Sequence, residues 1–133
     1  MSEKTKRSTM GTFAIALNGL SVLKWLAIVG AAFLVRDKES ATFTMVMGGA
    51  LVVFYAWVTY GLSQGLSSAC DRAVRVHIVM AVLSGLGVMM VLGKPMALAM
   101  QIGSLVWHAG TAWVTNSARN DFRELPGGWK LND

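Results

Sequence analysis

The amino-acid sequence predicts an all-α integral membrane protein, a four-helix bundle with both termini in the cytoplasm. Three observations support this fold class. Of the 133 residues, 54% are apolar and 14% are charged, and that charged share is about half of what is typical of a soluble domain. The chain contains four long runs that are nearly free of charged residues. The basic residues gather in the short segments between those runs, as membrane topology requires.

The four uncharged runs set the number of membrane crossings. No charged residue occurs in 40–70, 76–93 or 95–118, and 8–35 contains only Lys24. A helix needs about 20 residues to cross a hydrocarbon core of ~30 Å, so each run is long enough for one span and too short for two. We therefore expect one membrane domain, 1–133, with spans at approximately 11–35, 41–63, 76–93 and 95–116 and a cytoplasmic tail at 117–133.

The basic residues also predict the orientation. Eight Lys and Arg residues lie before the first span, between the second and third spans, or after the fourth, against three in the other two connections. Cytoplasmic segments carry the excess of Lys and Arg, so both termini are expected in the cytoplasm. The apolar stretch near the N-terminus is too long for the core of a signal peptide, so cleavage is not expected. The compactness of the chain suggests a bacterial inner membrane.

The fourth span carries a stripe of polar residues. Their spacing of three and four residues places them on one face of a helix. Polar side chains avoid lipid, so this stripe should face the bundle interior or a neighbouring subunit, either as interhelical hydrogen bonds or as the lining of a solute path. The stripe consists of Gln101, Ser104, His108, Thr111 and Thr115. The other spans could add Asn18, Ser21, Tyr55, His77 and Ser84 to a mildly polar centre.

Lys24 is the most informative single residue. It lies near the middle of the first span, where burial of a lysine costs ~2.5–3.5 kcal/mol, and no span core contains an Asp or Glu that could pair with it. Four explanations are open: a tilted span that lets it reach the head groups, a neutral or hydrated amine near Tyr55 or His108, a carboxylate from another protein, or an anion or lipid phosphate. The candidate intramembrane polar site consists of Lys24, Asn18, Tyr55, Gln101, Ser104, His108 and Thr111.

The sequence predicts no catalytic, metal or cofactor site, and therefore no enzyme. His77 is expected at the cytoplasmic start of its span and His108 deeper in the membrane, so a haem held between the two rings is not expected. Two histidines without further ligands also make a poor metal site. Cys70 is expected in a cytoplasmic loop as a reduced thiol. The absence of intramembrane carboxylates argues against cation-coupled transporters such as the small multidrug exporters.

Composition and packing features lead to three hypotheses of function. The first is a small polytopic membrane subunit or scaffold, which associates with itself or with a larger membrane complex. Small residues at four-residue spacing, such as Gly61 and Gly65, would allow helices to approach closely. Its partners would be the lipid bilayer and other membrane subunits, and not nucleic acid. The alternative is an oligomeric channel or transporter for a small anionic or polar solute, with Lys24 in its path, and the third is a holin-like pore former.

Overall fold

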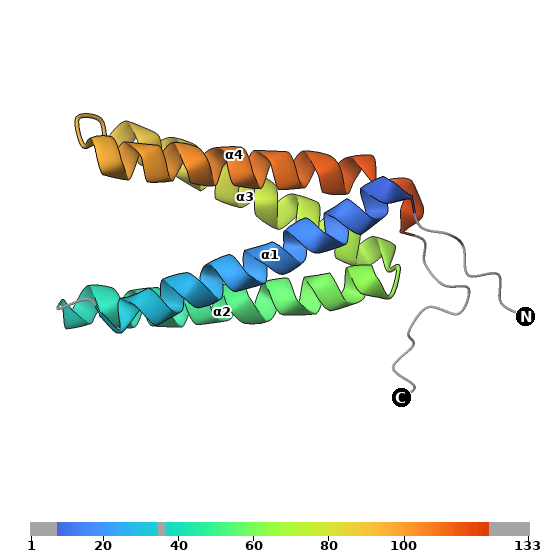
Figure 1. Cartoon of the computed structure of the whole chain (residues 1–133), viewed down its shortest axis with the longest axis horizontal. Coiled ribbons are helices and arrows are strands. Elements are labelled where there is room, and N and C mark those ends of the chain that lie inside the picture. Colours follow the sequence, from blue (N-terminus) through green and yellow to red (C-terminus); the bar gives the residue numbers. More distant parts are fainter. Residues whose placement is uncertain (1–7, 35–36, 123–133) are drawn as a thin grey trace, which may run out of the picture.

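The computed structural model describes residues 8–34 and 37–122. These residues form four α-helices and one short 3-10 helix, with no strand among them: α1 (Thr9–Ala32), α2 (Lys38–Ser63), α3 (Ser67–Met90), α4 (Pro95–Ser117) and η1 (Arg119–Asp121). The predicted all-α four-helix fold is confirmed (Figure 1). The predicted tail beyond Phe122, and the basic residues before Ser8, lie outside the described residues.

Local sequence signals explain where the helices begin. The Ser8 hydroxyl accepts a hydrogen bond from the Gly11 amide at the start of α1, at 3.2 Å, which satisfies one of the unpaired amides of the first turn. The Asp37 carboxylate does the same for Glu39 at the start of α2. A further hydrogen bond from the Ser40 hydroxyl holds the pKa of the Asp37 carboxyl below its ordinary value.

Two glycines and a proline shape the remaining connections. Gly65 follows α2 with a φ of 81°, and Gly93 follows α3 with a φ of 88°. Both values lie in the left-handed region, where a side chain would be strained. Pro95 occupies the first position of α4, where its missing amide costs no hydrogen bond. The turns between α2 and α3 and between α3 and α4 are therefore encoded locally.

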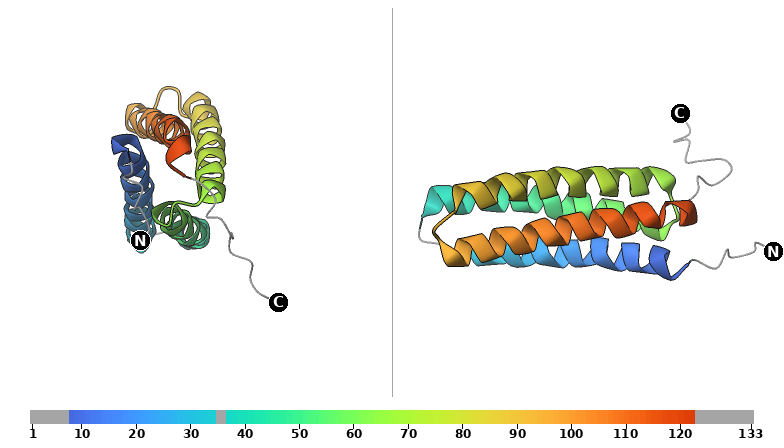
Figure 2. Two further views of the ribbon diagram at one scale, coloured as in Figure 1. Left: turned by 90° about the vertical axis from the view of Figure 1, so that its right-hand side faces the viewer. Right: turned by 90° about the horizontal axis from the view of Figure 1, so that it is seen from above.

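The helices form two hairpins, one of α1 with α2 and the other of α3 with α4. Packing is far more extensive within each hairpin than between them. The hairpins converge at the end where α1 begins and α4 ends, and they diverge towards the opposite end (Figure 1). Viewed along the bundle, the four helices surround a common axis in chain order (Figure 2). At the convergent end the Ser8 hydroxyl donates to the Asp121 carboxylate, and Phe122 is buried in the core.

The surface of the bundle is that of a membrane protein. Large apolar side chains are exposed along all four helices, including Phe33, Val53, Leu86 and Val106. Three of the four described helices, α1, α2 and α3, are long and apolar enough to cross a membrane. The interior, in contrast, holds small residues and a group of polar side chains. Apolar side chains outside and polar ones inside is the arrangement that a lipid solvent favours.

The start of the third helix differs from expectation. The helix begins at Ser67, nine residues before the uncharged run 76–93, so Cys70 lies in α3 and is fully buried rather than in a loop. Charged residues did not end the helix because they lie on its outer face, where Arg72 and Arg75 are exposed. The Arg72 guanidinium lies 4.4 Å from the ring centre of Trp57, a cation–π contact between α3 and α2.

Gly61 gives a test of the packing between α2 and α3. A Cβ added at Gly61 would lie 2.7 Å from the Cβ of Ala69, whereas one added at Gly49 would meet nothing within 4 Å. We expect Gly61→Ala to lower the free energy of unfolding by about 1–3 kcal/mol relative to Gly49→Ala, because the helices must move apart. Chemical unfolding in detergent micelles measures this difference. Equal stability of the two variants would contradict the close contact.

Candidate functional site

A buried polar network connects α1, α3 and α4 in the interior of the bundle. Lys24 Nζ lies 2.9 Å from His108 Nε2, and His108 Nδ1 lies 2.8 Å from His77 Nδ1. His77 Nε2 lies 3.2 Å from Asn18 Oδ1, and Asn18 Nδ2 lies 3.2 Å from Thr115 Oγ1. All of these side chains except Lys24, which is partly buried, have no more than 1% exposure. We call these five residues the polar network.

The backbone of α1 sets the direction of every hydrogen bond in the network. Asn18 Nδ2 lies 2.8 Å from the Ala14 carbonyl, which can only accept, so the amide oxygen faces His77 and accepts from His77 Nε2–H. In a neutral imidazole the other nitrogen is an acceptor. His77 Nδ1 therefore accepts from His108 Nδ1–H, and His108 Nε2 is left to accept from Lys24. The network thus orients a neutral imidazole acceptor towards the Lys24 ammonium.

The Lys24 ammonium keeps donors in reserve. An ammonium has three N–H donors, and in the part of the chain that the structure describes Lys24 makes one hydrogen bond, to His108. Its Nζ also lies 5.4 Å from the ring centre of Trp25. No carboxylate of the described residues forms an ion pair with it, since the one such pair joins Arg119 to Asp71. The charge is therefore positioned without being neutralised by an acid.

The remaining predicted residues surround the network without joining it. Thr111 is buried, and Ser104 accepts a hydrogen bond from the Ser84 hydroxyl at 3.0 Å. Gln101 packs closely on Gly87, where an added Cβ would lie 2.7 Å from Gln101 Oε1. Tyr55 is fully buried, and its ring lies against His77, not Lys24, with 5.0 Å between ring centres. Among the described residues the Tyr55 hydroxyl has no hydrogen-bond partner.

The expectation that His77 and His108 lie at different depths is wrong. The two rings are in contact, with their centres 5.1 Å apart. The reason is the early start of α3: His77 lies ten residues inside a helix that begins at Ser67, and His108 lies nine residues before the end of α4 at Ser117. Because these helices are antiparallel neighbours, the two positions are level. The sequence also shows His77 and Ser84 on one helix face, which was the available signal.

The geometry of the two histidines is that of a hydrogen bond, not of a metal site. A metal shared by two nitrogens at 2.0–2.1 Å from each would need a nitrogen separation of about 4 Å in a linear arrangement, and the Nδ1 atoms are 2.8 Å apart. Over residues 8–34 and 37–122, no group of three or more His, Cys, Asp or Glu side chains could hold a metal ion.

A crevice lies beside Lys24, in the seam between α1 and α4. Its volume is about 480 Å³, and its lining comes from these two helices: Lys24, Trp25, Ile28, Met100, Gln101, Gly103, Ser104 and Trp107. Trp107 is fixed by a hydrogen bond of 3.1 Å from its Nε1 to the Ser21 hydroxyl. Because the lining residues belong to the second half of α1 and the first two-thirds of α4, the crevice lies towards the divergent end of the bundle.

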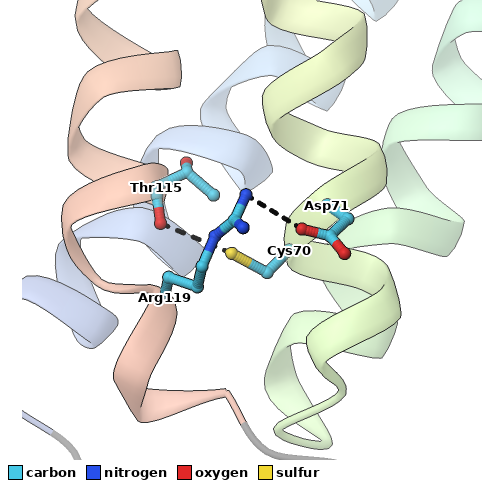
Figure 3. A network of polar contacts seen from close by, with 4 residues as sticks. All are labelled: Cys70, Asp71, Thr115 and Arg119. Atoms are coloured by element: carbon cyan, nitrogen blue, oxygen red, sulfur yellow. Dashed lines mark hydrogen bonds and ion pairs between the residues drawn. The ribbon is translucent and has the colours of Figure 1, made fainter.

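The network ends near a polar cluster at the convergent end. The Cys70 thiol lies 3.4 Å from the Thr115 carbonyl oxygen, and the Arg119 guanidinium lies 3.0 Å from the Asp71 carboxylate (Figure 3). Both contacts join α3 to the last turn of α4 or to η1. The ion pair is about half exposed, so it adds at most about 1 kcal/mol. These contacts close the bundle on the side opposite the crevice.

Comparison of the chain with protein-family models, with curated proteins and with solved structures found no match. The function therefore has to be argued from the site.

Proposed function

We propose that this protein is a multi-pass membrane protein, with both termini in the cytoplasm of a bacterium, that binds and transfers a small anionic or polar solute at Lys24. The observation that carries the proposal is the position of the Lys24 ammonium. It lies between an oriented acceptor, His108, and an unfilled crevice of about 480 Å³. Pockets of roughly 300–1,000 Å³ with few placed polar groups are typical of small-molecule sites.

The order of the polar network supports the binding of an anion. A lysine inside a membrane span is costly and marks function more often than structure. Here the network supplies a neutral acceptor on one side of Lys24, so the positive charge stays available on the other side. A carboxylate, phosphate or other anion in the crevice would receive the remaining N–H donors in charge-assisted hydrogen bonds, which are about twice as strong as neutral ones.

The division into two hairpins supports transfer of the solute in addition to binding. The crevice lies where the hairpins diverge, and the polar network fills the interior where they converge. Rocking of two packed units about a site between them is a common route of alternating access. Since packing between the hairpins is less extensive than within them, the hairpins can rock with little repacking of either one.

The second candidate is a membrane subunit, and one observation favours it. The crevice lies in a seam between two helices on the outside of the bundle. A helix of a partner protein could place a carboxylate against Lys24 there, in place of a solute. Cross-linking in native membranes followed by mass measurement separates the candidates: a constant protein partner at α1 or α4 supports the subunit, and a monodisperse protein without one supports solute binding.

Solute flux into liposomes tests the proposal directly. Protein reconstituted in liposomes is supplied with chloride, acetate, phosphate or glycerol, and uptake is followed for each. We expect Lys24→Met to reduce uptake of the preferred solute by about tenfold or more, because it removes a charge-assisted hydrogen bond worth roughly 1.5–3 kcal/mol. Lys94→Met is the matched control, because Lys94 is exposed in the turn before α4. Uptake that is equal in both variants would contradict the proposal.

A further inference from the structure

The lining of the crevice indicates which class of solute it accepts. Resting on the proposed function, we infer that the crevice takes an amphipathic organic anion, with a carboxylate or phosphate head group on Lys24 and an apolar body against Trp25 and Trp107. Trp25, Ile28, Met100 and Trp107 supply an extensive apolar lining, and Lys24, Gln101 and Ser104 supply the polar groups. An occupant that satisfies both parts of this lining must itself have an anionic end and an apolar end.

A second unpaired donor supports an oxygen-rich head group. Trp25 lines the crevice, and its indole Nε1 is buried without a hydrogen-bond partner among the described residues. Buried polar groups are almost always hydrogen-bonded, so an acceptor is missing beside this residue. Lys24, its neighbour in the sequence, has N–H donors to spare. A carboxylate or phosphate has enough acceptor positions to satisfy both side chains, whereas an alcohol or ether oxygen has fewer and carries no charge.

The position of the crevice argues for an apolar body. A small inorganic anion would lose much of its hydration shell against the two indoles, and Lys24 is the one cation that lines the crevice. Removing a charge from water without full compensation is expensive. Because the lining comes from α1 and α4 alone, the seam opens to the side of the bundle, where lipid chains would lie. An amphipathic anion keeps its apolar part in that environment and moves only its head group to Lys24.

Two sources could supply this chemistry: an anionic lipid that enters from the bilayer, or an amphipathic acid from the aqueous phase. Both present the same head group and apolar body to the crevice. They differ in whether anionic lipids of the membrane compete for the site, and the experiment separates them on that basis.

Binding to the full-length protein in phosphatidylcholine nanodiscs tests the inference. The probes are decanoate, decanol and decyltrimethylammonium, and the readout is the tryptophan fluorescence of the protein, with binding to empty nanodiscs subtracted. We expect saturable binding of decanoate that is about tenfold or more tighter than binding of decanol, as one charge-assisted hydrogen bond provides. We expect no saturable binding of the cation. Equal affinity for decanoate and decanol would overturn the inference.

Three variants sharpen the result. Lys24→Met should weaken decanoate binding to the level of decanol, and Lys94→Met should leave it unchanged. Trp25→Phe keeps an aromatic ring and removes the N–H donor, so decanoate should bind about three- to tenfold more weakly. If all three variants bind decanoate like the wild type, the site is elsewhere and the inference is wrong. In nanodiscs that contain phosphatidylglycerol, weaker apparent binding of decanoate identifies lipid as the source, and unchanged binding identifies the aqueous acid.

The inference and the proposed function can fail separately. Decanoate binding that depends on Lys24, without solute flux in liposomes, would overturn transfer and leave the ligand class in place. Acetate flux that depends on Lys24 and that decanoate does not inhibit would leave transfer in place and overturn the ligand class.

Discussion

Replacing His108 by leucine is expected to destabilise the protein by about 3–5 kcal/mol, because the change leaves a buried charge without its hydrogen-bond partner. His108 is fully buried, and its two ring nitrogens contact Lys24 at 2.9 Å and His77 at 2.8 Å. Leucine fills a similar volume and cannot serve either neighbour. The measurement is the free energy of unfolding in detergent micelles, with Thr42→Leu as a control at an exposed helix position.

A double-mutant cycle separates the electrostatic cause from packing. Lys24→Met alone removes the costly charge and leaves His108 Nε2 without a donor, so the two effects should nearly cancel, to within about 1–2 kcal/mol. In Lys24→Met/His108→Leu no charge remains to be stranded, and we expect the double variant to be more stable than His108→Leu. Strictly additive losses would show that His108 acts through packing alone, because coupling is what the cycle measures.

The helices could be predicted from the sequence because lipid restricts what can cross it. Each uncharged run had the length of one helix, and the structure has helices at all four. The stripe from Gln101 to Thr115 was also visible, since the side-chain period of a helix does not depend on its neighbours. His108, Thr111 and Thr115 on that stripe are buried in the bundle. These features are local, and local spacing is enough to recognise them.

The polar network could not be predicted, because it depends on which positions of different helices are level. Charge counting placed the start of the third span at 76, and from that start His77 seemed too shallow to meet His108. Helix α3 begins instead at Ser67, because Asp71, Arg72 and Arg75 tolerate a helix whose inner face is Ala69, Cys70 and Ala73. The crevice depends on the divergence of the two hairpins, which no sequence period encodes.

Among the explanations open for Lys24, a contact with His108 is the one that the structure displays. Tyr55, the other neighbour considered, lies against His77 instead. The contact still leaves donors of the ammonium without acceptors among the described residues. A partner carboxylate and an anionic ligand therefore remain complementary to the geometry, since either could bind from the crevice while His108 holds the opposite side.

Asn18 should control the order of the whole network, and Asn18→Leu should therefore affect both stability and the histidine tautomers. The substitution leaves His77 Nε2–H and the Thr115 hydroxyl without their present partner, at an expected cost of about 2–4 kcal/mol for buried unsatisfied groups. Asn116→Leu is the matched control, because Asn116 is exposed on α4. Chemical unfolding of both variants gives the stability difference.

The tautomers provide a readout that loss of packing alone would not move. In the wild type, the Ala14 carbonyl fixes the Asn18 amide, so His77 carries its proton on Nε2 and His108 carries its proton on Nδ1. Nitrogen NMR of ¹⁵N-labelled histidine distinguishes these forms directly. We expect one tautomer for each ring in the wild type and in Asn116→Leu, and a mixture in Asn18→Leu, because nothing then selects the direction of the hydrogen bonds. Unchanged tautomers in Asn18→Leu would mean that Lys24, acting from the other end of the network, sets the order by itself.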